Sequence, residues 1–210
     1  VFGETCYCMY LSADLVFSGN NPPDGGYTES HAPDPVSVVG KTFVEAETHF
    51  ARLSRWSIIR LGLPMGSSVD GYKGGVDFIE YRLSRGLPMS LFDDELRSCI
   101  DCDVLAAAVT DMLLREATGL YHLGGARAVS LYEIGEAILL RGGYDPQNLK
   151  RWSRRDDIHG PPRIGNVHLN SGKIEAFLGW KIPEWRIGKE GFWFVLGSDH
   201  SNALKNKGLS

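Results

Sequence analysis

Two pairs of cysteines are the first residues in this sequence whose spacing could do chemistry. Cys6 and Cys8 stand two positions apart, and Cys99 and Cys102 form a C-x-x-C pair. Thiolates at such spacings can share a zinc ion or take part in redox reactions. Neither pair is flanked by turn glycines as in zinc knuckles, and cysteine in an apolar strand behaves as a small hydrophobic residue. A structural role is therefore favoured, and we expect no metal site.

Two charged clusters and one histidine are further candidates. Asp93-Asp94-Glu95 could bind a cation through its oxygens, but such a run is more typical of a hairpin turn. The segment from Lys150 to Arg155, K-R-W-S-R-R, could pair with a diphosphate and stack on a base, or lie in a solvated loop. His31 could supply a proton from its long loop, or be an ordinary surface histidine. The structural alternatives are favoured, and for the basic segment the binding alternative stays open.

The stretch from Tyr10 to Glu47 is expected to position whatever chemistry the chain carries. Apolar residues over 5–17 without alternation predict a strand buried on both faces, and residues 18–35, rich in proline and glycine, predict a long loop. An apolar face predicts a helix from Ser37 to about Arg55, and residues 56–66 predict a second buried strand. Strand, helix and strand in this order form a right-handed parallel unit, so we expect α/β architecture. Ligands bind such sheets beyond the carboxyl ends of their strands.

The remainder of the chain is expected to alternate short elements and loops. Capping and breaking signals predict helices over 76–84, 103–114, 130–140 and 173–178, with N-caps at Asp103, Ser130 (in a capping box with Glu133) and Asn170. Short strands are expected at 89–92 and 120–123, and loops at 71–75 and 145–163. The tail from Trp180, which contains Phe192-Trp193-Phe194, is left unassigned.

Composition limits the classes of function. The chain has 210 residues, 43% of them hydrophobic and 23% charged, as in soluble globular proteins. A net charge of −4 offers no basic surface for nucleic acid or anionic membrane. No window of about 18 apolar residues would span a bilayer, and no leader indicates export, so a cytoplasmic location is expected. The chain begins at Val1 and enters a strand almost at once, as a fragment or processed chain does.

Several blocks resemble one known group of enzymes. Residues 11–19, L-S-A-D-L-V-F-S-G, are similar to the strand motif S-T-D-x-V-F-x-G of that group. Tyr27-Thr28-Glu29, followed by Pro33 and Pro35, is similar to its Y-T-E…P-x-P loop. Residues 39–47 are similar to its Y-G-x-[ST]-K…E helix. Further blocks cover residues 60–66, 97–105 and 121–136. Over residues 7–180 the chain therefore resembles the extended short-chain dehydrogenase/reductase superfamily, and within it the dTDP-4-dehydrorhamnose reductase-like group, which reduces nucleotide sugars with NAD(P)H.

The resemblance implies a fold and its division. We expect an α/β fold with a partial Rossmann-type parallel sheet and a small mixed α/β substrate lobe. Residues 1–65, with a helix at about 103–116, would be the carboxyl-terminal part of the NAD(P)-binding domain. Residues 66–102 and 117–210 would form the substrate-binding lobe and the tail.

The same resemblance assigns catalysis to a threonine, a tyrosine and a lysine. Their positions here are Ala13, Val39 and Phe43, none of which can donate a proton or hold a hydroxyl group. Lys41 lies two residues from Phe43, so on a helix it points about 200° around the axis, away from the pocket. Misalignment is a poor explanation because flanking residues stay in register: Ser12, Asp14, Gly40, Thr42 and Glu47.

Cofactor and substrate contacts are also implied by the resemblance. The expected cofactor contacts are Ser12, Ala13, Leu61, Gly62 and Leu63, and the expected substrate contacts are Asp14, Phe17, Arg97, Arg151 and Trp152. The implied cofactor is NAD or NADP. Its glycine-rich phosphate loop would precede the first helix of the domain, whereas this chain begins at about the fifth strand. The runs at 71–75 and 124–125 are interpreted as turn glycines, so the diphosphate has no evident cradle.

Three hypotheses follow. The favoured one is a degenerate family member that binds a nucleotide, a nucleotide sugar or a partner protein. A second is a working oxidoreductase acting on a 4-keto nucleotide sugar, with missing strands supplied elsewhere and His31 as the replacement acid. A third is a structural subunit whose open strand edge docks on a second copy or on a partner chain.

Overall fold

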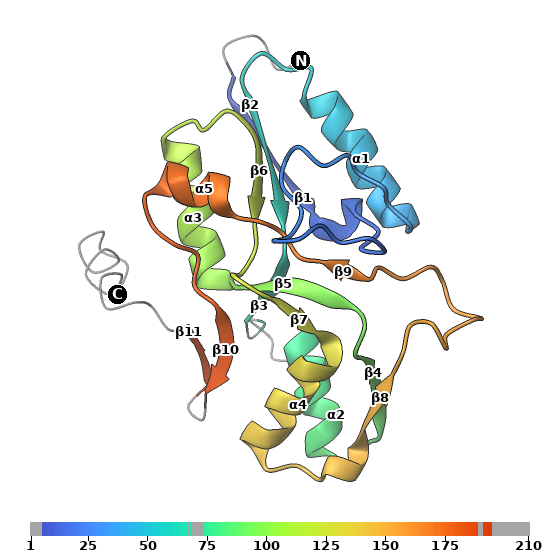
Figure 1. The fold of residues 1–210 in the computed structure, drawn as a ribbon. Helices are drawn as coiled ribbons and strands as arrows, with labels where there is room; N and C mark the ends of the chain where they lie inside the picture. The colour runs from blue at the N-terminus through green and yellow to red at the C-terminus, as the bar shows by residue number, and fades with distance from the viewer. Residues whose placement is uncertain (1–5, 67, 69–73, 189–190, 195–210) are drawn as a thin grey trace.

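Three parallel strands form the centre of the upper half of the molecule in Figure 1. The computed structural model describes residues 6–66, 68, 74–188 and 191–194. The strands are β1 (Cys8–Ala13), β2 (Trp56–Leu61) and β6 (Gly119–Leu123), in the order β1-β2-β6. This arrangement confirms the predicted α/β class and parallel sheet. Burial of the first strand on both faces was a wrong prediction, because β1 is an outer strand of this sheet and Leu11 is 43% exposed.

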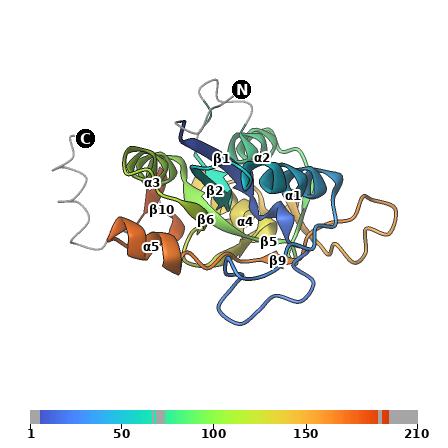
Figure 2. The same ribbon diagram turned by 90° about the horizontal axis from the view of Figure 1, so that it is seen from above.

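Helices cover both faces of this sheet. Helix α1 (Val38–Phe50) lies on one face, while α3 (Cys102–Leu114) and α5 (Gly172–Leu178) lie on the other (Figures 1 and 2). The α3 side holds an apolar core that includes Ile59, Ala108, Met112, Leu123 and Ile174. A short 3-10 helix, η1 (Asp14–Val16), follows β1 directly and packs against α1. The predicted helix after Ser37 is confirmed, with Ser37 as its N-cap.

A second sheet crosses beneath the first. Strand β5 (Leu96–Asp101) pairs in parallel with β3 (Leu63–Met65) and β9 (Asn166–Val167), and antiparallel with β7 (Ala128–Ser130). The single strand expected over 56–66 is therefore wrong, since it divides between two sheets at Gly62. A Cβ at Gly62 would lie 2.0 Å from the carbonyl oxygen of Ser98, so glycine is required where β5 passes.

The small lobe lies at the bottom of Figure 1. Helices α2 (Gly75–Ser84) and α4 (Leu131–Gly142) pack together around Val76, Ile79 and Ile138. Strand β4 (Met89–Phe92) pairs in parallel with β8 (Leu149–Trp152), which follows η2 (Pro146–Asn148). Two expectations are corrected by this pairing: residues 145–163 are not wholly a loop, and Asp93-Asp94-Glu95 is not a hairpin turn, because β4 pairs with β8 and not with β5.

The N-caps of α3 and α5 differ by one or two residues from the predicted ones, and that of α4 agrees. Asp101, not Asp103, caps α3, since its carboxylate accepts hydrogen bonds from the backbone N–H groups of Asp103 and Val104. Ser130 caps α4 as predicted, but the Glu133 carboxylate accepts from Arg127 in place of completing the capping box. The N-cap of α5 is Ser171, one residue after the predicted Asn170.

The last described strands form a hairpin in the unassigned tail. Strands β10 (Trp185–Gly188) and β11 (Gly191–Phe194) pair antiparallel, so the Phe192-Trp193-Phe194 run lies in β11. Strand β6 and helix α5 lie with the β1–β2 sheet, although the sequence grouped residues 117–210 with the substrate lobe. The functional division into a cofactor domain and a substrate lobe stays a prediction.

Candidate functional site

The three positions that the resemblance marks as catalytic lie around the end of β1. Ala13 is the last residue of β1, Val39 lies in the first turn of α1, and Phe43 follows one turn later. Val39 is 53% exposed, whereas Phe43 packs against the cluster around Val16 and Phe17. Each of these side chains is a hydrocarbon. They can therefore neither give a proton to a carbonyl oxygen nor polarise it.

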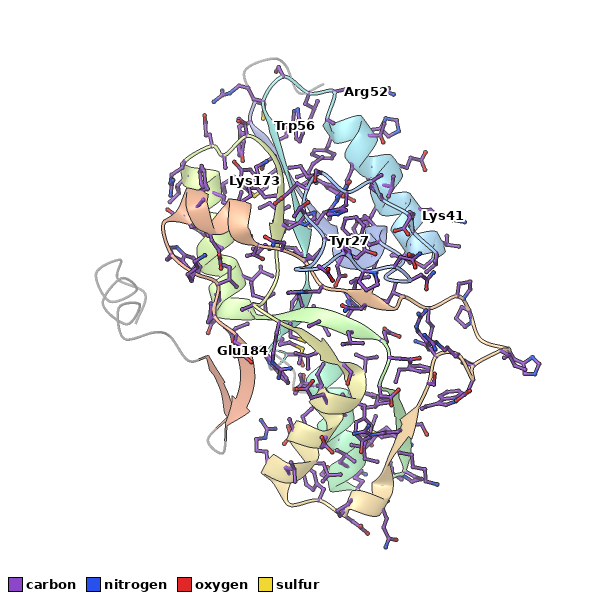
Figure 3. The ribbon with its side chains drawn as sticks, viewed as in Figure 1. Tyr27, Lys41, Arg52, Trp56, Lys173 and Glu184 are labelled. Atoms are coloured by element: carbon purple, nitrogen blue, oxygen red, sulfur yellow. The ribbon has the colours of Figure 1, made fainter. Side chains whose placement is uncertain are left out.

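The nearby ionisable groups do not replace them. Tyr10 stacks on Phe50 with ring centroids 4.7 Å apart, and burial, reinforced by the Glu47 charge, raises the pKa of Tyr10. A catalytic tyrosine requires the opposite shift. His31 is held within its own turn, where Nδ1 accepts a hydrogen bond of 2.9 Å from the backbone N–H of Thr28. Lys41 is exposed and points away from the sheet (Figure 3), as the helical geometry predicted.

A buried polar network lies directly beneath this hydrocarbon surface. The Arg60 guanidinium donates two hydrogen bonds to Glu47, at 2.9 and 2.7 Å, and the Ser12 hydroxyl donates a third at 2.6 Å. Ser12, Arg60 and His122 are register partners across β1, β2 and β6, so their side chains share the face that α1 covers. The side chains of Arg60 and Glu47 are only 4% and 9% exposed. This pair therefore fixes α1 on the sheet.

His122 extends the network as a neutral imidazole. Its Nε2 lies 3.4 Å from Arg60 Nη1, which can only donate, so Nδ1 carries the proton and donates to the Tyr27 carbonyl oxygen at 2.8 Å. Burial, with a smaller contribution from the Arg60 charge, lowers the pKa of His122 to about 4, although the bond to Tyr27 acts in the opposite sense. Sequence reasoning missed this network. Its only signal was a polar residue in each of three apolar segments.

A second buried ion pair joins two of the expected substrate contacts. Arg97 Nε and Nη2 donate to the Asp14 carboxylate at 2.7 and 2.5 Å. Burial works against the charge of Arg97, and the Asp14 carboxylate outweighs it, so that the pKa of Arg97 is raised. Phe17, a third expected contact, is fully buried and stacks on Tyr27 at 4.1 Å. The structure thus brings these three residues together, since the backbone N–H of Phe17 also donates to the Asp14 carbonyl oxygen, and Asp14 and Phe17 are buried. Of the three guanidinium nitrogens of Arg97, Nε and Nη2 donate to Asp14 and Nη1 does not.

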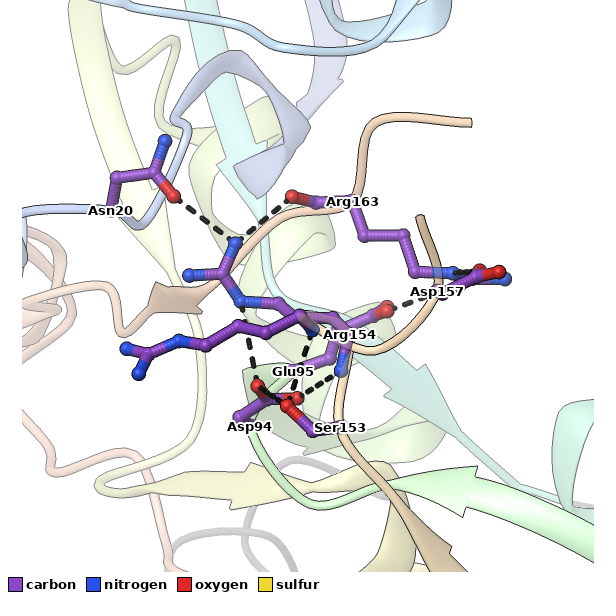
Figure 4. A network of polar contacts seen from close by, with 8 residues as sticks. Asn20, Asp94, Glu95, Ser153, Arg154, Asp157 and Arg163 are labelled. Carbon is purple, nitrogen blue, oxygen red and sulfur yellow. Dashed lines mark hydrogen bonds and ion pairs between the residues drawn. The ribbon is translucent and has the colours of Figure 1, made fainter. Parts of the chain in front are cut away.

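The basic segment lies elsewhere, on β8 and the following loop. Two of its arginines and Arg163 pair with the acidic run. Arg151 pairs with Asp93 at 3.9 Å, and Figure 4 shows the region where Arg154 pairs with Asp94 at 4.0 Å and Arg163 with Glu95 at 3.2 Å. The expected substrate contact Trp152 stacks on Phe92 at 5.0 Å, and Arg151 lies over the ring of Tyr132. Two of the four positive charges of the segment, those of Arg151 and Arg154, are therefore paired within the lobe.

Arg154 connects the lobe to the loop that follows β1. Its Nη1 donates to the side-chain oxygen of Asn20 at 3.1 Å and to the Arg163 carbonyl oxygen at 3.3 Å (Figure 4). The backbone N–H groups of Gly165 and Asn166 bond the carbonyl oxygens of Ser18 and Gly19. The loop beside the family positions is consequently held by residues more than a hundred positions away in the sequence.

Comparison with known proteins decides the family. The model of the family described as RmlD substrate binding domain matches residues 5–192. This chain belongs to that family. It is 27% identical to methionine adenosyltransferase 2 subunit beta of Rattus norvegicus (89% of this chain and 57% of that protein). It is 24% identical to the probable low-salt glycan biosynthesis reductase Agl14 of Haloferax volcanii (83% of this chain and 59% of that protein).

Solved structures agree with the family. A hypothetical dTDP-4-dehydrorhamnose reductase from Sulfolobus tokodaii is similar with a TM-score of 0.69 and 25% identity, over 84% of this chain and 60% of that one. A UDP-glucose 4-epimerase from Thermus thermophilus shares the fold at a TM-score of 0.72, with 21% identity, over 88% of this chain and 61% of that one. The chain spans 57% and 59% of the length of these two curated relatives. None of the helices in the described part of the chain is long and apolar enough to cross a membrane.

The cofactor of this family can be tested against the residues present. Gly124 and Gly125 pack on β5, since a Cβ at Gly125 would lie 1.9 Å from the Cys99 carbonyl oxygen. They serve close strand packing and leave no room for a diphosphate. Of the expected cofactor contacts, Ser12 gives its hydroxyl to Glu47, Gly62 packs on Ser98, and Ala13, Leu61 and Leu63 are half-buried. Gly124 and Gly125 therefore do not fit a dinucleotide diphosphate, and residues 71–73 lie outside the described part of the chain.

The cysteines and acidic residues are also placed by the structure. Cys99 is buried, and burial raises the pKa of its thiol to about 12, whereas Cys6 and Cys102 are exposed. Within the described part of the chain, His, Cys, Asp and Glu side chains form no group of three or more arranged to hold a metal ion.

Proposed function

We propose that this chain is a catalytically degenerate member of the RmlD substrate-binding-domain family, which binds a nucleotide, a nucleotide sugar or a partner protein without transferring hydride. The observation that carries the proposal is Ala13, Val39 and Phe43 at the three family positions, within a frame that is otherwise intact. Proton transfer to a carbonyl needs an ionisable group within hydrogen-bond reach, and these side chains have none.

Two buried ion pairs stabilise the region around the three family positions. The Glu47–Arg60 and Asp14–Arg97 pairs are buried, and each keeps two charge-assisted hydrogen bonds. Losing one partner of either pair would strand the other in the interior, so the two pairs hold the end of β1 and α1 in a defined arrangement. A defined arrangement of this kind supports a binding role for this region of the protein.

Partner binding has separate support. The curated relatives include a protein named as a subunit of methionine adenosyltransferase, which indicates assembly in that case. Among the described strands, β1 is an outer strand of its sheet, and such an edge can pair with a strand of the same protein outside these residues, of a second copy or of a different chain. All four cysteines are free, which supports the cytoplasmic location that forms part of the proposal.

A working oxidoreductase is the second candidate. Relatives named as reductases favour it, and one structure with this fold is recorded in complex with NADP and another with NAD. It requires a glycine-rich loop supplied by a segment outside these residues, and a replacement acid such as His31. NAD or NADP would then bind at the carboxyl ends of β1 and β2, near Ala13 and Leu61.

One assay distinguishes the two candidates. The full-length protein, including any segment outside these residues that supplies the glycine-rich loop, is mixed with NADH or NADPH and a dTDP-4-keto-6-deoxy sugar, and cofactor oxidation is followed by absorbance, with a family reductase as the positive control. We expect no oxidation above the rate without protein. Turnover that His31→Ala abolishes, while the matched surface variant His49→Ala retains it, would establish the oxidoreductase and refute degeneration.

A further inference from the structure

We infer that the outer face of α2 is a docking surface for an acidic, amphipathic helix of a partner protein. The surface consists of Phe78, Tyr81, Arg82 and Arg85, which we call the α2 stripe. Phe78, Tyr81 and Arg82 are three and four residues apart on one face of α2, and Arg85 is the C-cap residue that follows at the end of the helix. The stripe lies on the small lobe, away from the family positions at the end of β1 (Figure 1).

Apolar exposure is the first observation. Phe78 is 53% exposed and Tyr81 41% exposed, although α2 already buries Val76, Ile79 and Leu83 against the lobe core. The helix therefore carries two apolar faces, and only one of them is covered by the described residues. Exposed aromatic residues beside arginine have the composition found at the centres of protein interfaces.

The distribution of charge on α2 is the second observation, and it indicates the charge of the partner segment. Both carboxylates of the helix point elsewhere: Glu80 pairs with Arg141 of α4 at 2.7 Å, and Asp77 accepts from the backbone N–H groups of Ser68 and Gly74. Arg82 and Arg85 have no carboxylate partner among the described residues. The stripe is thus purely positive.

The arginines are also held in place. Arg82 lies over the Phe78 ring at 5.9 Å and Arg85 over the Tyr81 ring at 4.7 Å, so each cation rests on an aromatic face. Arg82 is held further by a hydrogen bond of 2.6 Å from Nη2 to the Pro88 carbonyl oxygen. The two arginine charges lie three residues apart and repel each other, and opposing carboxylates would relieve that repulsion. The complementary ligand is a segment with an apolar stripe flanked by Asp or Glu.

A helical protein segment fits better than a lipid surface. Polybasic membrane recruitment depends on clusters of about four to eight cations, and the stripe offers two. A ridge of side chains on a helix receives another helix by groove packing, and the stripe has no strand edge to extend. The inference deepens the partner-binding part of the proposed function, and its test measures peptide binding where the earlier assay measures cofactor turnover, so either can fail alone.

The probe is a fluorescent helical peptide of about 20 residues with a leucine stripe flanked by glutamates, long enough to form a helix. Its counterpart carries lysines in place of the glutamates. Binding to the full chain is measured by anisotropy at physiological salt. We expect the acidic peptide to bind with a dissociation constant on the order of 10–100 μM and the basic peptide at least tenfold more weakly.

Charge reversal tests the location. The double variant R82E/R85E is expected to lose acidic-peptide binding at least tenfold and to gain binding of the basic peptide, a swap that misfolding cannot produce. The milder pair R82Q/R85Q should lose the acidic peptide without gaining the basic one. The matched control R52E/R155E reverses two exposed arginines outside the stripe and should leave both affinities unchanged.

Three results would overturn the inference. One is acidic-peptide affinity that R82E/R85E leaves unchanged, and another is no binding of that peptide at millimolar concentration. The third is binding of phosphatidylserine vesicles, lost in R82E/R85E, without binding of the peptide, which would assign the stripe to a membrane surface.

Discussion

The hydrocarbon surface at the family positions and the polar network beneath it have opposite characters. At the surface, Ala13, Val39 and Phe43 present no group that reacts, and Val39 is 53% exposed. One layer below, Glu47 and Arg60 keep a complete set of charge-assisted hydrogen bonds in near-total burial. The two layers lie on the same strand and helix, since Ala13 follows Ser12 in β1 and Glu47 follows Phe43 by one turn of α1.

The difference is explained by what each layer does for the free energy of folding. An exposed catalytic side chain contributes little to stability, so its replacement by alanine or valine is tolerated. A buried ion pair cannot lose one member without stranding a charge in the interior. Under the proposed function, the catalytic groups could therefore be replaced while the ion pair beneath them remained. Four predictions test this contrast, from the largest effect to the smallest.

Arg60→Leu should cause the largest loss of stability. It would leave the Glu47 carboxylate buried without its cation, at a cost of about 3–5 kcal/mol in the free energy of unfolding. Urea denaturation measures this loss. The double variant E47L/R60L removes both charges and should recover much of it, because neither charge is then stranded. A single-variant loss below about 1 kcal/mol would show that the network does not hold α1 on the sheet.

Acid should weaken the same layer through His122. Its pKa is lowered to about 4 in the folded protein from 6.5, so the unfolded chain binds a proton over this interval and the folded protein does not. The free energy of unfolding is thus expected to fall by about 3 kcal/mol as the pH drops from 6.5 to about 4. Below pH 4 the protonation of His122 should cause no further change. In His122→Gln this contribution should vanish, whereas the control His49→Gln should keep it. Parallel pH profiles for wild type and His122→Gln would contradict the assignment.

Arg97→Ala should have a somewhat smaller effect. It strands the fully buried Asp14, but the Arg97 side chain is 13% exposed, so water reaches the vacated space more readily than at Arg60. We expect a loss of about 2–4 kcal/mol by urea denaturation at neutral pH. Protonating Asp14 would relieve the stranded charge, so the deficit should shrink as the pH is lowered. A deficit that is constant with pH would indicate lost packing of the Arg97 side chain instead.

The sequence predicted the parts of the fold that are local. The parallel unit, α1 and the replacement of the three side chains that the resemblance marks as catalytic could all be inferred from patterns within about 50 residues. Strand β5 was missed because its alternation is weak and Arg97, a buried cation, reads as a surface residue until Asp14 is placed beside it. The sequence predicts one long strand through Gly62, because the need for glycine there comes from its close approach to Ser98, which lies in β5.

Long-range pairing accounts for the other gaps. The acidic run at Asp93 and the basic segment at Arg151 were interpreted separately, as a turn and as a possible diphosphate contact. Their pairing depends on β4 and β8 lying in register, which no local pattern encodes. The polar network was invisible for the same reason, because Glu47, Arg60 and His122 come from three separate elements.

Val39→Tyr restores the family's tyrosine at the exposed surface and should have the smallest effect. Val39 makes few contacts to lose, so the free energy of unfolding should change by less than about 0.5 kcal/mol. The added hydroxyl should not produce cofactor oxidation, because the residues at positions 13 and 43 still provide neither a hydrogen bond nor a cation. Leu114→Tyr, at another exposed helical position, is the matched control for stability. A loss above about 2 kcal/mol for Val39→Tyr alone would mean that this surface is packed as tightly as the layer below, and the contrast between them would fail.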